Sequence, residues 1–266
     1  MPTAKISRGE IHYDCKGEGS PVVMVLAQST GPKGVGPFID RLARDFMVVR
    51  FDALGNGRSS PVQGADDVSM AARASEVIGV LDDLGLETAR LCCHSTGCGI
   101  GLTVASTYPE RVAGLALMAP WTHGDPYLTV MQHLRVAAAR ALGPRDYERF
   151  NASLVFPPGY RRANEVGFTR LAETAAAPDA DRIADRLNGI LAFDARPLLG
   201  AIACPALVVS ATDDQLMPAW FGREMAAGIP GARLIELTEA GHMIPETKGA
   251  ELAAQVAEFF AETGAK

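Results

Sequence analysis

The chain has few cysteines, and their spacing suits neither a disulfide framework nor a zinc site. The five cysteines are an odd number, without C-x-x-C pairs and without histidines at ligand spacing. Cys92, Cys93 and Cys98 cluster in one stretch, and Cys204 directly precedes an apolar run. We therefore expect buried, reduced thiols, as in a cytoplasmic protein, and no metal site.

Long apolar runs and blocks of basic charge are also missing. No apolar run approaches the ~20 residues that span a bilayer, and residues 1–5 lack the apolar core of a signal peptide. A net charge of −6 without a basic block argues against nucleic acid as a partner. We expect a cytoplasmic protein that has neither a membrane nor a nucleic acid among its partners.

The composition allows a full hydrophobic core. Of the 266 residues, 48% are hydrophobic and 21% are charged, which suits one α/β domain with an insertion. Short apolar runs alternate with helical patterns, and this predicts a mostly parallel sheet with helices on both faces. The expected strands are 11–15, 21–26, 46–51, 89–93, 112–118, 206–210 and 233–237. The expected helices are 68–86, 97–108, 220–227 and 251–262.

The pattern changes in the middle of the chain. Residues 120–197 are mostly helical in pattern, with Pro157, Pro158 and Pro178 as breaks and no strong strand. We predict a helical lid here, inserted into a core formed by residues 1–119 and 198–266.

A serine lies in the turn that follows the expected strand 89–93. The sequence Cys-His-Ser-Thr-Gly places Ser95 between an apolar strand and a helical pattern, the context that lifts a nucleophilic serine clear of a sheet. The usual pattern is G-x-S-x-G, and here Cys93 replaces the first glycine while Gly97 keeps the second. His94 adjoins the serine, and we expect its side chain to point elsewhere.

A base and an acid follow two later strands. Asp214 comes after strand 206–210, and His242 comes after the last strand. Because the ends of neighbouring parallel strands lie side by side, these residues can converge on Ser95. His242 would be the general base, and Asp214 would hold its tautomer. No cofactor is required.

Two assignments at this site have close alternatives. Asp213 is the nearest rival to Asp214, which we favour because D-x-x-x-P, ending at Pro218, follows the strand at the expected distance. His123, at the entry to the predicted lid, is equally well interpreted as a pocket residue and as a loop histidine.

Several segments together resemble the α/β-hydrolases over nearly the full length of the chain. They are Phe51-Asp-Ala-Leu-Gly-Asn-Gly-Arg-Ser-Ser60, the C-H-S-T-G turn, Tyr108-Pro-Glu-Arg-Val112, the Asp214 segment and Ala240-Gly-His242. The resemblance implies an α/β-hydrolase fold with Ser95, Asp214 and His242 in order. Residues 140–147 and 186–194 resemble the aminoacrylate hydrolases of pyrimidine utilisation and the 3-oxoadipate enol-lactonase-like enzymes. Residues 240–245 read more like generic esterases and lactonases.

The oxyanion hole needs two backbone N–H donors. Thr96, directly after the serine, supplies one. The resembling family usually has His-Gly after strand 21–26, followed by the second donor, and this chain reads Leu-Ala-Gln-Ser-Thr-Gly over 26–31. By position Gln28 is the donor, and a shift of one residue gives the role to Ser29. The glycine-rich loop 31–36 lacks both the G-K-[ST] ending and a helix for phosphate binding, so we interpret it as a flexible pocket rim.

The sequence thus predicts a serine hydrolase that cleaves a small carboxylic ester or lactone through an acyl-enzyme. Trp121, Tyr127, Met131 and Phe156 are expected either to line an apolar substrate pocket or to form the core of the lid. Carbamate or enamine hydrolysis, C–C bond hydrolysis and acyl or perhydrolytic transfer are alternatives on the same three residues. A non-catalytic, receptor-like binding protein is the alternative from another class. The sequence does not indicate the natural substrate or the oligomeric state.

Overall fold

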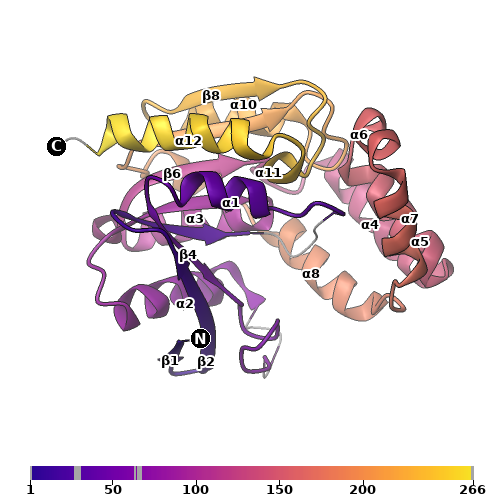
Figure 1. Ribbon diagram of the computed structural model, residues 1–266, viewed down its shortest axis with the longest axis horizontal. Coiled ribbons are helices and arrows are strands. Elements are labelled where there is room, and N and C mark those ends of the chain that lie inside the picture. Colours follow the sequence, from indigo (N-terminus) through magenta and orange to yellow (C-terminus); the bar gives the residue numbers. More distant parts are fainter. Residues whose placement is uncertain (1, 27–30, 63, 65–67, 265–266) are drawn as a thin grey trace.

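The computed structural model describes residues 2–26, 31–62, 64 and 68–264, and it contains one eight-stranded sheet (Figure 1). The strand order is β1-β2-β4-β3-β5-β6-β7-β8. The β1–β2 and β2–β4 pairs are antiparallel, and every pair from β4 to β8 is parallel. The strands are β1 Thr3–Ile6, β2 Gly9–Lys16, β3 Pro21–Val25, β4 Met47–Phe51, β5 Ala89–His94, β6 Val112–Met118, β7 Ala206–Ala211 and β8 Arg233–Leu237.

The parallel strands are apolar throughout because helices cover both faces of the sheet. All six residues of β5 are buried. Leu91 and Cys93 pack on one face, and Cys92 packs on the other. The alternation follows from the two-residue period of a strand. The predicted strands are confirmed, except that β1 was not expected: Ala4 is its only buried residue, so it has no apolar pattern to detect.

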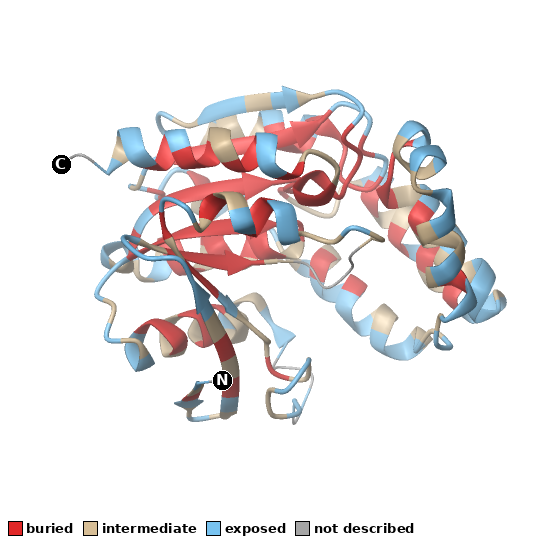
Figure 2. Cartoon of the chain, in the orientation of Figure 1, coloured by how far each residue is buried: buried red, intermediate tan, exposed pale blue. Residues whose placement is uncertain are grey.

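Two groups of helices form the outer layers. One face carries α2 Met70–Asp83, α3 Thr96–Thr107, α9 Arg196–Leu199 and α10 Ala219–Gly228. The other carries α1 Gly36–Leu42, α11 Ile244–Thr247 and α12 Gly249–Thr263. Figure 2 shows that burial is concentrated in the sheet and on the inward sides of these helices.

Helix α1 corrects the interpretation of the glycine-rich loop. A helix does begin at Gly36, directly after that loop, with Pro37 in its first turn. Phe38, Ile39 and Leu42 are buried against the α12 side of the sheet. Seven residues are too few for an apolar period to be recognised in the sequence.

A run of helices connects β6 to β7, within the predicted insertion. They are α4 Pro126–Ala141, α5 Pro144–Val155, α6 Pro158–Ala163, α7 Glu165–Glu173 and α8 Ala180–Ala192. Asp125 caps α4 by accepting from Leu128 N at 2.7 Å. In Figure 1 these helices lie beyond the end of the sheet toward which β6 and β8 point. This places them beside the carboxyl ends of the parallel strands.

The free thiols divide by position. Cys92, Cys93 and Cys98 are buried, as expected, whereas Cys15 is exposed near the end of β2. Among the helices that the structure describes, none is long and apolar enough to cross a membrane.

Candidate active site

Ser95 lies at a sharp turn between β5 and α3. Its φ of 55° and ψ of −121° are a conformation that costs a non-glycine residue about 1–3 kcal/mol. Two backbone hydrogen bonds hold the turn: Ser95 N donates to Met118 O at 2.9 Å, and Ser95 O accepts from Cys98 N at 2.8 Å. The turn therefore presents the serine at the carboxyl end of the sheet.

Glycines allow α3 to pass close to the strands. A Cβ at Gly97 would lie 1.9 Å from Val25 O, so this position admits no side chain. A Cβ at Gly101 would lie 2.4 Å from Cys93 Sγ. The space that a glycine usually leaves at the position of Cys93 is thus provided one turn along the helix, by Gly101.

A chain of hydrogen bonds links Ser95, His242 and Asp214. His242 Nε2 lies 2.9 Å from Ser95 Oγ, and His242 Nδ1 lies 2.8 Å from Asp214 Oδ2. All three residues are buried, with no more than 5% of their surface exposed. Because a carboxylate only accepts, Nδ1 carries the proton and Nε2 is free to accept from the serine hydroxyl. The three residues therefore have the connectivity of a nucleophile, a base and an orienting acid.

The structure assigns different partners to the two neighbouring aspartates. Asp214 Oδ1 accepts from the backbone N–H groups of Leu216 and Met217, at 2.8 and 2.9 Å, while its Oδ2 contacts His242. Asp213 Oδ1 instead accepts from Ala240 N and Gly241 N, at 3.1 and 3.2 Å. Asp213 therefore holds the loop on which the histidine lies, and Asp214 contacts the imidazole.

The His242 loop also contacts the helices between β6 and β7. His242 N and Met243 N both donate to Val155 O, the last residue of α5, at 2.9 and 3.1 Å. Gly241 has a φ of 58°, and a Cβ there would lie 2.8 Å from Pro157 Cδ. The end of α5 thus helps to position the histidine.

His94 points toward the His242 backbone. Its Nε2 donates to His242 O at 2.8 Å, and the two ring centroids are 5.2 Å apart. Burial first, and the nearby His242 second, lower the pKa of His94 to about 3. His94 is therefore neutral, and its hydrogen bond to His242 O helps to hold the loop that carries the catalytic candidate His242. Nothing in the sequence pattern indicates this contact.

Glu246 is a second residue that the sequence does not reveal. Only 6% of it is exposed, and it accepts from Gly31 N at 2.6 Å, Lys33 N at 3.0 Å and Tyr160 Oη at 2.9 Å. Desolvation and the hydrogen bond to Glu246 raise the pKa of Tyr160. One carboxylate thus joins the loop after β3, the helix α6 and the segment after His242.

Of the predicted oxyanion donors, only Thr96 lies among the residues that the structure describes. Thr96 is the first residue of α3, and the first N–H groups of a helix have no intrahelical acceptor. Gln28 and its alternative Ser29 lie outside the residues that the structure describes.

The four predicted pocket residues belong to the helical segment or its approach. Trp121 is fully buried and donates from Nε1 to Ile190 O at 3.2 Å. Phe156 is buried and stacks on Tyr160, with the two ring centroids 5.4 Å apart. Both lie in one apolar cluster with Met217 and Met243, which are close in sequence to Asp214 and His242.

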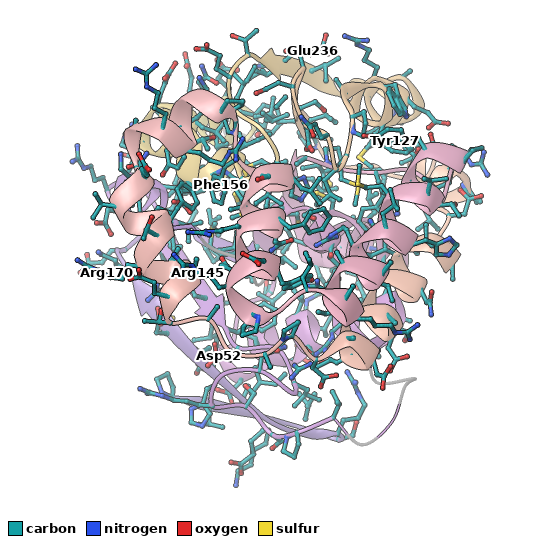
Figure 3. All side chains as sticks on the ribbon, turned by 90° about the vertical axis from the view of Figure 1, so that its right-hand side faces the viewer. Asp52, Tyr127, Arg145, Phe156, Arg170 and Glu236 are labelled. Carbon is teal, nitrogen blue, oxygen red and sulfur yellow. The ribbon has the colours of Figure 1, made fainter. Side chains whose placement is uncertain are left out.

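The other two lie nearer the surface. Met131 is partly buried against the same cluster. Tyr127 is 38% exposed, and its hydroxyl donates to Gln215 O at 2.6 Å. Figure 3 looks onto these helices and labels Tyr127, which lies on α4, and Phe156, which directly follows α5. His123 lies at the start of this segment, 3.5 Å from a Glu224 carboxylate oxygen.

A cavity of about 490 Å³ opens beside the ends of β3 and β4. Its apolar lining includes Leu26 and Ile100, the latter on the helix that follows Ser95. Its polar lining includes Asn56, Arg73 and Glu76. Within the described part of the chain, no three His, Cys, Asp or Glu side chains are grouped to hold a metal ion.

Comparison with known proteins agrees with this architecture. A family described as alpha/beta hydrolase fold matches residues 32–249. A curated protein from Azorhizobium caulinodans, named putative carbamate hydrolase RutD, is 30% identical over 91% of each chain. Among solved structures, the enol-lactonase from Burkholderia xenovorans LB400 has a TM-score of 0.84 at 26% identity, covering 98% of this chain and all of that one. Est816, described as an N-acyl homoserine lactone degrading enzyme, has a TM-score of 0.80 at 25% identity, covering 97% of this chain and 100% of that chain.

A mostly parallel sheet, a serine on a strained strand–helix turn and an inserted helical segment define a class of hydrolytic enzymes. The chain belongs to the α/β-hydrolase family. It is a hydrolase that acts on a small molecule.

Proposed function

We propose that this protein is a serine hydrolase that cleaves a small carboxylic ester or lactone through an acyl-enzyme. The observation that carries the proposal is the buried chain from Ser95 Oγ through the His242 ring to Asp214. His242 takes the serine proton as the hydroxyl attacks the carbonyl, and it returns that proton to the leaving oxygen. Asp214 holds the imidazole tautomer and stabilises its charged form.

The oxyanion of the tetrahedral intermediate is stabilised by backbone N–H groups in this proposal. Thr96 supplies one from the start of α3, and Gln28 supplies the other on the basis of its sequence position. Water then attacks the acyl-enzyme with His242 acting again as base. Residues 120–197 act as a lid, and Trp121, Tyr127, Met131 and Phe156 give its inner side an apolar character.

Carbamate hydrolysis is the second candidate. The Azorhizobium relative, a putative carbamate hydrolase, supports this candidate, and the reaction would use the same nucleophile, base and acid. The enol-lactonase and lactone-degrading structures support the ester and lactone assignment. Membership in a hydrolase family favours both over the receptor-like alternative.

Covalent labelling tests the nucleophile. We expect a fluorophosphonate probe to form one adduct, located on the peptide that contains Ser95 by mass spectrometry. The His242→Ala variant, which lacks the base, should not label at a comparable rate. Labelling at another serine, or equal labelling of the two proteins while both are folded, would contradict the proposal.

A further inference from the structure

The helices between β6 and β7 bury a polar cluster that the proposed mechanism does not use. Gln132 and Arg135 lie on the inward face of α4, where Gln132 is fully buried and Arg135 is 7% exposed. Arg135 Nη1 donates to Gln132 Oε1 at 3.0 Å, and Arg135 Nη2 donates to Asn151 Oδ1 at 3.4 Å. Asn151 belongs to α5, so the cluster spans two helices of this segment.

Two donors in this cluster have no acceptor. Gln132 Nε2 and Arg135 Nε are buried and unpartnered among the residues that the structure describes. A buried donor without a partner costs free energy, and most such groups in native proteins are satisfied. These two groups can therefore donate to a water molecule or to a bound ligand.

A second guanidinium increases the positive charge nearby. Helices α4 and α8 pack against each other, and Arg186 lies on α8. Burial first, and Arg186 among the smaller causes, lower the pKa of Arg135 to about 10, so Arg135 remains charged at neutral pH. Guanidinium groups such as that of Arg186 are not deprotonated in proteins. Arg186 keeps solvent-exposed surface, which leaves a route from solvent to the cluster.

An exposed arginine on the same helix has a carboxylate partner, whereas Arg135 does not. Arg140, also on α4 but exposed, lies 3.4 Å from an Asp181 carboxylate oxygen. No ion pair joins Arg135 or Arg186 to a carboxylate anywhere in the described ranges. A buried guanidinium is stabilised by a paired anion, and none of the described carboxylates pairs with Arg135.

The cluster lies on the side of the helices that faces the core. Arg182, one turn before Arg186 on α8, donates to Gly55 O and Asn56 Oδ1, both at 2.9 Å, in the loop after β4. Asn56 lines the cavity beside β3 and β4. Leu128 lies two turns before Arg135 on α4, about 10 Å away along the helix, and it packs in the cluster of Met217 and Met243. The inward face of α4 thus leads from the neighbourhood of His242 to Arg135.

We propose that Arg135, Gln132 and Arg186 form a binding site for a carboxylate carried by the substrate, at the end remote from the scissile ester or lactone. Guanidinium groups bind carboxylates through strong, directional hydrogen bonds. The side-chain amide of Gln132 supplies a further neutral donor. This inference rests on the proposed function and specifies its substrate class: a short-chain acid whose other end is an ester or lactone.

Pairs of esters that match in chain length test the site. Methyl butanoate, pentanoate and hexanoate are each compared with the monomethyl ester of succinate, glutarate or adipate. We expect the wild-type protein to prefer the anionic member of at least one pair in kcat/KM. Arg135→Gln should reduce that preference about tenfold or more, while the neutral ester changes only about twofold. Arg140→Gln, on the same helix but exposed, should keep the preference.

Two further measurements keep the outcome decisive. Should Arg135→Gln not fold, Arg186→Gln is expected to show the same loss of preference. Added succinate, glutarate or adipate should raise the melting temperature of the wild-type protein and of Ser95→Ala, but not that of the Arg135 or Arg186 variant. This shift is measurable even if no ester is hydrolysed, so failure of the proposed function is separable from failure of the anion site. A wild-type protein without preference and without a shift, or a preference that survives in the variants, would overturn the inference.

Discussion

Two buried polar clusters of this molecule differ in how many of their hydrogen-bonding groups have a partner. Around Ser95, His242 and Asp214, each of the two aspartates accepts from backbone N–H groups, and both imidazole nitrogens have a partner. Around Arg135, two donors have no partner among the described residues. The first cluster has the hydrogen bonds that the proposed catalytic mechanism requires. In the proposal for the second cluster, a carboxylate of the substrate supplies the acceptor.

The difference follows from where each cluster lies. The first stands on strand ends and on α3, whose positions are set by the sheet and by the close contact of Gly97 with Val25 O. The second lies among the helices α4, α5 and α8, which pack in an apolar cluster that also includes Met217 and Met243. In the two proposals, the residues on the sheet layer make and break the bond, and the residues on the helices between β6 and β7 select the substrate.

Among changes that keep the serine, the largest effect is expected from the acid of the first cluster. Asp214→Asn should lower kcat by about 10³–10⁴-fold, because an amide does not fix the imidazole in the tautomer that accepts from Ser95. Hydrolysis of a neutral ester such as methyl butanoate measures this. Asp213→Asn, at the neighbouring aspartate, is the matched control, and its kcat should fall far less. Equal losses in the two variants would mean that the acid is wrongly assigned.

The buried His94, which contacts the His242 backbone, should make the free energy of unfolding depend on pH. The pKa of folded His94, about 3, lies below the ordinary histidine value of about 6.5. The unfolded chain therefore binds a proton first as the pH falls. The neutral, buried His94 makes its full contribution to the free energy of unfolding above about pH 6.5. Between about pH 6.5 and pH 3 this free energy falls by about 1.4 kcal/mol per pH unit.

His94→Phe should remove this part of the slope. Urea unfolding at several pH values between 4 and 7 would measure the free energy of unfolding of the two proteins. His133→Phe, an exposed position on α4, is the control and should follow the wild-type curve. Parallel curves for His94→Phe and the wild-type protein would contradict the assignment of a neutral, buried His94.

The smallest effects are expected on stability, from one change in each cluster. Asp213→Ala leaves two backbone N–H groups without their acceptor and should cost about 1–3 kcal/mol in the free energy of unfolding. Gln132→Glu removes an unpartnered donor but keeps an acceptor for Arg135 Nη1, so it should cost less than about 1 kcal/mol. Urea unfolding at neutral pH measures both. A larger cost for Gln132→Glu would show that the amide donor of Gln132 is already satisfied in the free protein.

The sequence predicts the sheet more completely than it predicts the site. Continuous apolar runs identify the strands from β3 to β7 because both faces of these strands are covered. Edge strand β1 and the short helix α1 carry too little pattern to be recognised. Ser95, Asp214 and His242 follow strand ends, so their order and position could be predicted. The contacts of His94 and Glu246 depend on loops brought together from distant parts of the chain. Whether a carboxylate lies beside Arg135 depends on how the helices α4, α5 and α8 pack.

Replacement of the nucleophile is the most direct test of the proposed mechanism. Ser95→Ala should fold with the far-ultraviolet circular dichroism of the wild-type protein, and its turnover of a neutral methyl ester should fall by about 10⁴-fold or more. We expect this loss with both the neutral and the anionic members of each ester pair. Retained turnover in a folded Ser95→Ala protein would contradict a mechanism that passes through this serine.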